Sequence, residues 1–164
     1  MIKKNYLALF AKSFNWAGFF LPKNVYIDCS KLYAFCRVLD DVVDEKSNLE
    51  LRVKRINEIK NILNKIYELN NNDRNRLDQN EYEIIVKDMI ILAENNNIKP
   101  IILNDLIKGV ESDLKPKVYL RSVKDLLIYS YRVAGTVGLM MAKILGVSDT
   151  RSLKGAIDLG IAMQ

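Results

Sequence analysis

The 164-residue sequence contains no histidine, and this absence excludes several kinds of site at once. Histidine-based triads, HExxH zinc sites and imidazole acid-base chemistry all need a side chain that the protein does not have. Glycine and proline are also scarce, at 7 and 3 residues, which excludes collagen-like and low-complexity classes. We therefore expect a folded chain whose length fits a single domain spanning residues 1–164.

Cysteine is limited to Cys29 and Cys36, seven positions apart. On one helix this spacing separates the two residues by two turns, or about 10 Å, which is too far for a disulfide. We expect both to be reduced, buried thiols.

Long hydrophobic runs are also missing, because no apolar stretch reaches the roughly 18 residues that cross a bilayer. The N-terminal stretch has Lys3 and Lys4 before an apolar segment, but Lys12 and Asn15 interrupt it and no small-residue cleavage site follows. We therefore expect a cytoplasmic protein without a signal peptide. Peripheral contact with a membrane, to collect a lipid substrate, is compatible with this expectation.

The net charge is positive, since 25 Lys and Arg against 20 Asp and Glu give +5, but the positive residues are scattered along the chain. A small excess of this kind weakly favours an anionic partner, such as a phosphate-bearing substrate. No basic-aromatic stripe or nucleic-acid motif occurs, so we expect no nucleic-acid partner.

Apolar residues recur at helical spacing through almost the whole chain, and hairpin signatures are absent, so the predicted fold is all-α. Ser47 and Ser122 are predicted N-caps, Ser47 in a capping box with Glu50; Pro100 suits a first helical turn, and Gly146 suits a helix end. Residues 14–23 and 70–80 are predicted loops. Helices are expected at about residues 3–12, 24–45, 47–69, 81–94, 100–114 and 122–145, with a last one after residue 149.

The predicted helix over residues 24–45 has two distinct faces. At about 100° per residue, one narrow stripe contains five polar residues: Tyr33, Arg37, Asp40, Asp41 and Asp44. The opposite side is apolar and comprises Leu32, Phe35, Cys36, Leu39, Val42 and Val43. Like charges four residues apart repel each other unless a cation or solvent neutralises them, so the stripe is a candidate cation site.

Magnesium is the ion that this pattern fits best. Mg²⁺ takes one or two carboxylates from a protein and fills its octahedron with water and phosphate oxygens, and Asp40 and Asp44 lie on successive turns. Arg37 could hold a phosphate oxygen, and Tyr33 could donate its hydroxyl. The alternative is that the stripe is simply the solvated face of an amphipathic helix, since DDxxD alone is a weak motif.

Three segments in this order resemble the squalene and phytoene synthase family. They are Lys12–Pro22 (KSFNWAGFFLP), Leu32–Glu45 (LYAFCRVLDDVVDE) and Tyr129–Gly138 (YSYRVAGTVG). The resemblance implies a terpenoid-synthase-type helical bundle around a central cavity, in which two prenyl diphosphates are joined head to head. It also implies Mg²⁺ ions, held by two aspartate-rich motifs, that help diphosphate to depart.

Site residues follow from the same resemblance. Asp40 and Asp44 would be Mg²⁺ ligands with Asp41 as a supporting carboxylate, and Tyr129 and Arg37 would be catalytic. The expected substrate-binding residues are Ser13, Phe14, Tyr33, Arg37, Tyr129, Ala134, Gly138 and Gln164.

Two further features leave alternatives open. The small residues Ala134 and Gly138 could form a smooth cavity wall beside a prenyl chain, or they could allow close packing of two helices; the resemblance favours the cavity wall. Asp113 lies in a segment that resembles the helix before the family's second motif, but a solvated acidic residue near a helix end is the preferred interpretation.

The sequence departs from the family at its end. The second aspartate motif should follow soon after the Gln that corresponds to Gln164, so we expect a bundle that is incomplete at its C-terminus and a chain with little or no synthase activity. A non-catalytic relative that acts in assembly is the alternative, and a helical interaction module is a third reading. The product, of carotenoid or hopanoid type, stays open, and NADPH would be needed only for a squalene-type product.

Overall fold

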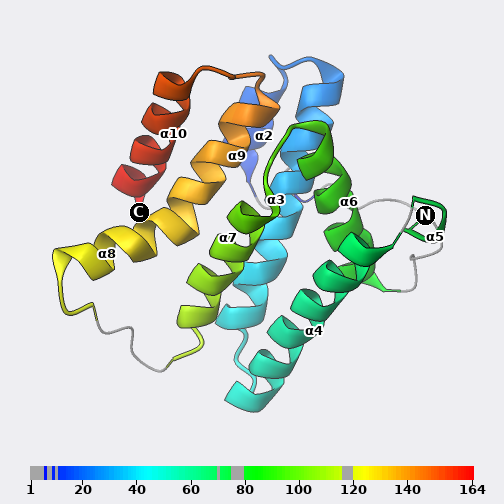
Figure 1. The fold of residues 1–164 in the computed structure, drawn as a ribbon, viewed down its shortest axis with the longest axis vertical. Helices are drawn as coiled ribbons and strands as arrows, with labels where there is room; N and C mark the ends of the chain where they lie inside the picture. The colour runs from blue at the N-terminus through cyan, green and yellow to red at the C-terminus, as the bar shows by residue number, and fades with distance from the viewer. Residues whose placement is uncertain (1–5, 7–8, 10, 70, 75–79, 116–119) are drawn as a thin grey trace.

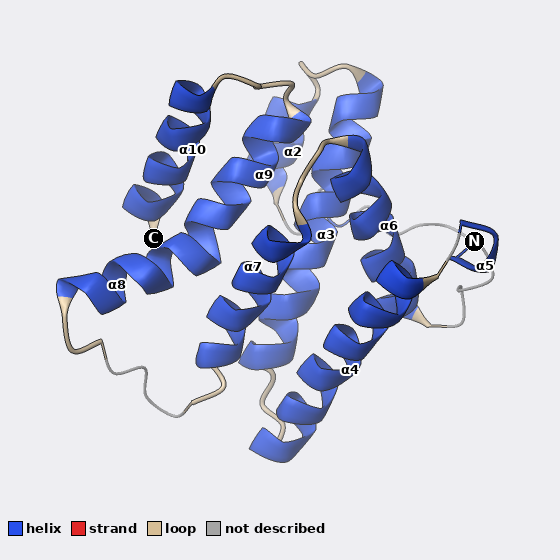
Figure 2. Ribbon diagram, in the orientation of Figure 1, coloured by secondary structure: helices blue, strands red, loops and turns tan. Residues whose placement is uncertain are grey.

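Helices build the described part of the chain. The computed structural model describes residues 6, 9, 11–69, 71–74, 80–115 and 120–164, and no strand occurs among them (Figure 2). The all-α prediction is therefore confirmed. The elements, in chain order, are α2 (Lys12–Gly18), α3 (Lys23–Asp44), α4 (Leu49–Glu68), α5 (Asn71–Arg74), α6 (Glu81–Asn95), α7 (Pro100–Ser112), α8 (Val123–Ser130), the π-helical turn η1 (Tyr131–Gly135), α9 (Thr136–Ile144) and α10 (Thr150–Met163).

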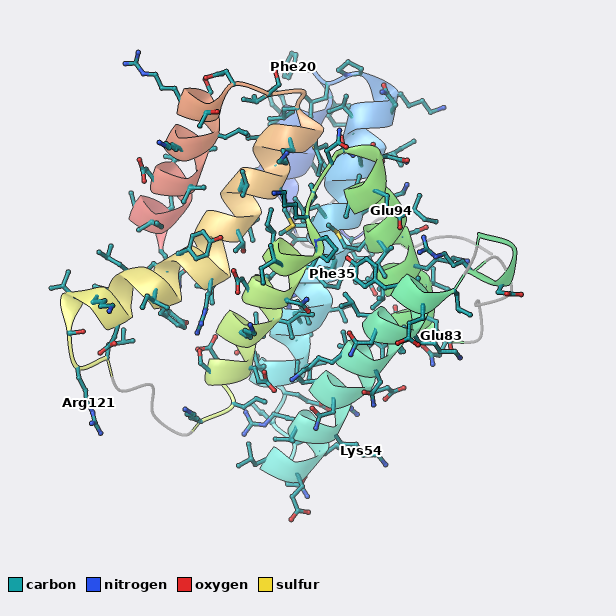
Figure 3. The ribbon with its side chains drawn as sticks, viewed as in Figure 1. Phe20, Phe35, Lys54, Glu83, Glu94 and Arg121 are labelled. Atoms are coloured by element: carbon teal, nitrogen blue, oxygen red, sulfur yellow. The ribbon has the colours of Figure 1, made fainter. Side chains whose placement is uncertain are left out.

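Helix α3 lies at the centre of this arrangement and packs against α4, α6, α7 and α9 (Figure 1). Its apolar side is the predicted one, and Phe35, at 1% exposure, sits in the middle of the molecule (Figure 3). The core continues into Ile56 and Ile66 of α4 and Met89 of α6, all buried. Because one side of α3 is buried against these helices, its polar stripe is turned away from the core.

Several local sequence signals mark helix ends as predicted. Pro100 occupies the first turn of α7, where a missing backbone N–H costs nothing. The Ser122 hydroxyl accepts a hydrogen bond from the Asp125 N–H at 3.1 Å and caps α8. Gly146, after α9, has φ of +85°, and the Asp149 carboxylate caps α10 by accepting from the Ser152 N–H at 2.9 Å.

Two predictions near the helix starts are wrong. The cap of α4 is Asn48, whose side-chain oxygen accepts from the Leu51 N–H at 2.8 Å, whereas the Ser47 hydroxyl has no hydrogen-bond partner. The predicted capping box therefore does not form. The predicted loop at residues 14–23 is partly helical, because no Gly or Pro interrupts residues 12–17 and the Asn15 N–H bonds to the Ala11 carbonyl at 2.8 Å.

The long helix predicted for residues 122–145 is interrupted by η1. Thr136, just after this turn, donates its hydroxyl to the Arg132 carbonyl at 2.7 Å, which is a side-chain bond that competes with the regular helical ladder. The predicted helix at 3–12 lies largely outside the described residues. Within the predicted loop at 70–80, Asn71–Arg74 form the short helix α5, so the prediction is wrong there, and residues 70 and 75–79 lie outside the described residues.

Both cysteines are free, with Cys29 buried and Cys36 half-buried, as the spacing predicted. Burial raises the pKa of the Cys36 thiol to about 12, so it behaves as a small apolar side chain. Within the part of the chain that the structure describes, no helix has the length and apolar character that a bilayer span requires.

Candidate functional site

The polar stripe of α3 carries one internal ion pair. Arg37 Nη2 lies 2.6 Å from Asp41 Oδ1, one turn further along the helix. This pair neutralises Asp41 locally, and Asp40 and Asp44 are the two carboxylates of the stripe that lie outside it. The supporting role of Asp41 in metal binding stays a prediction.

Asp40 has an unfavourable electrostatic environment. Partial burial and the neighbouring Asp44 raise its pKa from 3.8 to about 6, although Arg37 opposes the shift; Asp41 and Asp113 add smaller upward contributions. Repulsion among carboxylates of this kind disfavours their charged forms. A bound cation would remove the penalty, and in its absence Asp40 holds its proton to an unusually high pH.

Asp113, at the C-cap of α7, belongs to the same cluster. Its carboxylate accepts a hydrogen bond from the Tyr129 hydroxyl and lies close enough to Asp44 for that charge to contribute to raising its pKa, although burial is the larger cause. The pKa of Tyr129 is raised to about 12 by burial, by this hydrogen bond and by the charges of Asp113 and Asp40. Tyr129, predicted from a segment 85 positions after Asp44, thus joins the α3 carboxylates in space.

The prediction that Asp113 is a solvated acidic residue is wrong, because its side chain is half-buried. A physical sign was present: a carboxylate at a helix C-terminus faces the negative end of the helix dipole and is disfavoured there unless another group compensates. Tyr129 is that group. The hydrogen bond joins residues on two helices, and no local pattern announces such a contact.

Close backbone packing brings Tyr129 to Asp113. A Cβ on Gly109 of α7 would lie 2.8 Å from the Cβ of Arg132 and 2.8 Å from Cγ1 of Val133 in η1. Only a residue without a side chain lets these two elements approach so closely. Gly109 and Arg132 are near neighbours of Asp113 and Tyr129 in the chain, so this approach sets the geometry of the pair.

The donor set consists of oxygens, which suits a hard ion such as Mg²⁺. Among the described residues, no three His, Cys, Asp or Glu side chains converge as a group that could hold one metal ion. This finding is compatible with Mg²⁺, since that ion needs only one or two protein carboxylates when a phosphate supplies the others. Binding of Mg²⁺ by Asp40 and Asp44 stays a prediction.

The α2 residues of the predicted site are at the surface. Ser13 and Phe14 are exposed, and Phe14, Trp16, Phe19 and Phe20 expose between 63% and 81% of their surface, with Phe20 at the rim of the molecule (Figure 3). These aromatic side chains are therefore not part of the buried core of the described residues. Helix α2 is tied to α3 by the Tyr26 hydroxyl, which donates to the Asn15 side chain at 2.6 Å.

Ala134 and Gly138 take part in close helix packing. A Cβ on Gly138 would lie 2.3 Å from the Ala156 carbonyl oxygen of α10, and a Cβ on Gly160 would lie 2.5 Å from the Ala134 carbonyl oxygen. The packing alternative left open by the sequence thus applies to this crossing. Contact of these residues with substrate stays a prediction, as it does for Gln164, which is exposed at the end of α10.

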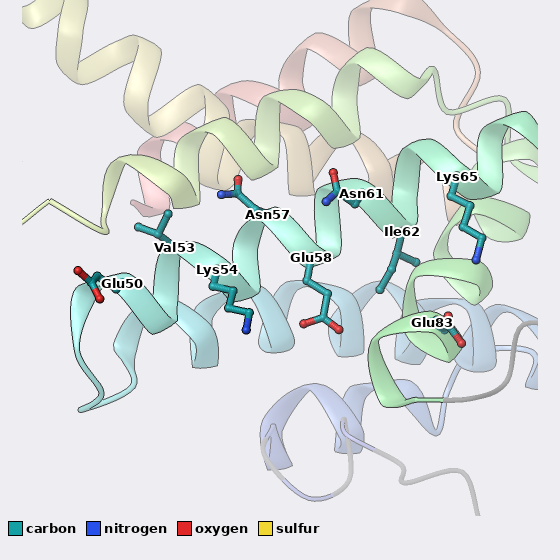
Figure 4. Close-up of a pocket in the computed structure, with 9 residues that line it drawn as sticks. All are labelled: Glu50, Val53, Lys54, Asn57, Glu58, Asn61, Ile62, Lys65 and Glu83. Carbon is teal, nitrogen blue, oxygen red and sulfur yellow. The ribbon is translucent and has the colours of Figure 1, made fainter.

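A separate groove of about 660 Å³ opens along α4 (Figure 4). Its surface is mostly apolar and is formed by Val53, Ile62 and the carbon chains of polar residues such as Lys54 and Lys65, with Glu83 reaching in from α6. None of the residues that line it belongs to the carboxylate cluster. We therefore take the carboxylate cluster, and not this groove, as the candidate functional site.

Comparison with known proteins gives a consistent picture. The model of the Squalene/phytoene synthase family matches residues 7–164. The chain is 33% identical over 156 residues to a 15-cis-phytoene synthase of Paracoccus sp., a match that covers 94% of this chain and 49% of that protein. It is 30% identical over 162 residues to a 15-cis-phytoene synthase of Enterobacter agglomerans, covering 94% and 51%.

A solved structure supports the same relationship at the level of the fold. The crystal structure of a dehydrosqualene synthase in complex with ligand superposes with a TM-score of 0.74 at 25% identity, covering 96% of this chain and 51% of that one. The predicted bundle type is therefore confirmed. The chain spans about half the length of the curated relatives it matches.

Proposed function

The chain belongs to the squalene/phytoene synthase family, and from this membership we propose that it supplies the first carboxylate motif of a Mg²⁺-dependent site for prenyl diphosphates. The reaction proposed for the whole protein is the head-to-head condensation of two such substrates. The names of the matched relatives favour a phytoene-type product, which is formed without a reduction step and hence without NADPH. We therefore propose a role in carotenoid biosynthesis.

The electrostatics of Asp40 carry the proposal. Its pKa of about 6 results from burial and from carboxylates that repel it, chiefly Asp44. Asp40 and Asp44 would hold Mg²⁺, with Asp41 in support through its pair with Arg37. The chemistry that such an ion would supply is positive charge, which would stabilise the negative charge that develops on the leaving diphosphate.

The chain's own side chains have distinct roles in this proposal. Arg37 pairs with Asp41 and its charge acts on Asp40, and its guanidinium offers donors in a fork that matches phosphate oxygens. Tyr33, half-buried on the same stripe, would donate its hydroxyl to the diphosphate. Tyr129, held by Asp113, would orient the substrate from the opposite side of the cluster.

Calorimetric titration of the purified chain with farnesyl thiodiphosphate, an analogue that resists ionisation, tests the proposal. We expect binding with MgCl₂ present, loss of binding in EDTA, and a weakening of more than about tenfold in the double variant Asp40→Asn, Asp44→Asn, which removes two charged ligands. Asp28→Asn is the matched control, since Asp28 lies on the same helix but pairs with Lys31 at 3.5 Å. Equal binding in EDTA, or by the double variant, would refute the metal site.

A further inference from the structure

Helices α3 and α7 pack against each other and end close together in space (Figure 1), and both ends carry acidic residues. Asp44 and Glu45 stand at the end of α3. Glu111 lies in the last turn of α7, and Asp113 is its C-cap. A helix C-terminus already has unpaired carbonyls and the negative end of the helix dipole, yet neither of these two fully described helices has a basic residue in its last turn. Any compensating side chain therefore belongs to another element.

Helix α4 supplies positive charge to the end of α3. Arg52 Nη1 donates a hydrogen bond of 2.8 Å to the Val43 carbonyl, which is one of the carbonyls that the end of a helix leaves without a partner. Arg55, one turn further along α4, pairs with Glu45. The two arginines thus hold the residues immediately before and after Asp44, while the Asp44 carboxylate lies outside both contacts.

Helix α4 reaches the end of α7 in a similar way. Lys60 Nζ lies 2.9 Å from Glu111 Oε1. Asp113, two residues later, lies outside this pair and accepts a hydrogen bond from the Tyr129 hydroxyl. Each of the two helix ends therefore has one carboxylate that pairs with α4 and one that belongs to the carboxylate cluster.

We propose that Arg52, Arg55 and Lys60 are positioning residues for the carboxylate cluster. By pairing with the neighbouring acidic residues and by holding the last turn of α3, they keep Asp44 and Asp113 in place for a divalent cation. The inference rests on the proposed function, because it concerns the same metal site. It goes beyond that function by giving a role in the site to α4, a helix that contributes no residue to the cluster itself.

The alternative is that these contacts only stabilise the fold. The two ion pairs are poorly suited to that role, because their four side chains each expose between 33% and 40% of their surface and exposed pairs contribute little stability. Arg52 differs, since its Nε is buried and has no hydrogen-bond partner among the described residues. A partly unsatisfied guanidinium is costly for stability alone, whereas its charge is favourable at the negative end of α3.

Calorimetric titration with farnesyl thiodiphosphate at a series of MgCl₂ concentrations tests the proposal. Arg52→Met removes the charge and the hydrogen bond and keeps a flexible side chain. The MgCl₂ concentration for half-maximal binding should rise by about tenfold, which is the usual scale for residues that support a metal ligand. Arg52→Lys, which keeps a charge and a donor, should recover most of the loss.

Lys54→Met is the matched control. It removes one positive charge from the same helix, at a residue that lines the groove of Figure 4 and makes no contact with the end of α3. The MgCl₂ requirement should not change in this variant. Circular dichroism checks the folding of each variant, and Lys60→Met, at an exposed pair, is the second test variant and should raise the requirement in the same direction.

An Asp44→Asn background separates positioning from stability. If Arg52 acts through Asp44, adding Arg52→Met to this background should change the MgCl₂ requirement by less than about twofold. A purely stabilising role predicts the same change in both backgrounds. Urea unfolding in EDTA measures the stability that each variant loses.

Two results overturn the positioning role and leave the metal site standing. One is an equal MgCl₂ requirement in the unchanged chain and in folded Arg52→Met and Lys60→Met. The other is an additive effect of Arg52→Met in the Asp44→Asn background. Absence of Mg²⁺-dependent binding by the unchanged chain is a different result, because it refutes the metal site itself and the positioning role with it.

Discussion

The hydroxyl of Tyr129 donates a hydrogen bond to the carboxylate of Asp113, joining the last turn of α8 to the end of α7. The bond partly offsets the cost of placing Asp113 near Asp44, because it lowers the pKa that burial raises. It also anchors one side of the carboxylate cluster to a helix distant in sequence from α3.

Replacement of Tyr129 by phenylalanine should therefore destabilise the folded chain at neutral pH. The Asp113 carboxylate would lose its donor while still facing Asp44, at a cost of about 1 kcal/mol in the free energy of unfolding. In an Asp113→Ala background the same replacement should cost close to nothing. Urea unfolding of the two single variants and the double variant measures this coupling, and purely additive effects would contradict the pairing.

The raised pKa of Asp40 makes stability depend on pH. Because its pKa of about 6 in the folded chain exceeds the ordinary 3.8, the folded chain holds this proton more tightly than the unfolded chain does. The resulting stabilisation is complete below about pH 4 and is lost as the pH rises through about 6.

The stability of Asp40→Asn relative to the unchanged chain should therefore increase from pH 4.5 to pH 7.5. The gain should be about 1 kcal/mol or less, because the Asp40 side chain, although crowded by neighbouring atoms, keeps an exposed surface at which solvent screens its charge. Urea unfolding in EDTA at both pH values measures the difference. A constant difference between the two proteins at the two pH values would argue against repulsion at this site.

The crossing of α9 and α10 should be sensitive to a single methyl group. In Gly138→Ala the new Cβ would meet the Ala156 carbonyl oxygen at 2.3 Å, and the displacement of α10 should cost about 1–3 kcal/mol. Gly155→Ala is the matched control, because its Cβ would meet nothing within 4 Å. Thermal unfolding should show a lower Tm for the first variant and an unchanged or higher Tm for the second, since alanine favours the helix.

Arg74 should be the most important arginine for stability. Its Nη1 binds both carboxylate oxygens of Glu94, at 2.8 and 2.9 Å, and its Nε donates to the carbonyls of Ile66 and Leu69 at the end of α4. Arg74→Met would leave these acceptors unpaired, at a cost of about 2–3 kcal/mol.

The more exposed pair of Arg55 with Glu45 provides the comparison for Arg74. Arg55→Met should cost less than about 1 kcal/mol in the free energy of unfolding, because an exposed ion pair contributes little. Similar losses in the two variants, measured by urea unfolding, would show that burial of Arg74 adds nothing.

Much of the fold could be predicted from local patterns. The helix that carries the aspartates was expected at residues 24–45 and occupies Lys23–Asp44. It could be predicted because the spacing of its apolar residues indicates both a helix and its buried side. Gly146 and Asp149 acted as expected, since a positive φ and an N-cap depend on the residue itself. The prediction of Ser47 as the N-cap of α4, in place of the next residue Asn48, was wrong because both residue types are good caps and packing decides between them.

The site was only partly predictable. The stripe on α3 follows from spacing alone, whereas the partner of Tyr129 depends on how closely α7 approaches η1. That approach is set by the missing side chain of Gly109, which is not evident until the two elements are seen together. The π-helical turn was missed for a similar reason, because a single Thr136 side-chain bond and tertiary packing outweigh a regular apolar period.

The π-helical turn at Tyr131–Gly135 has a consequence for how the chain tolerates change in length. A π turn accommodates one residue more than the α-helical period, so it sets the rotation of α9 about its axis relative to α8. Deletion of one residue here would therefore restore a regular helix and leave Tyr129 at nearly the same angle relative to Gly138. A deletion in the regular turn that follows, between Thr136 and Gly138, would instead turn the tyrosine by about 100° relative to the α9–α10 crossing.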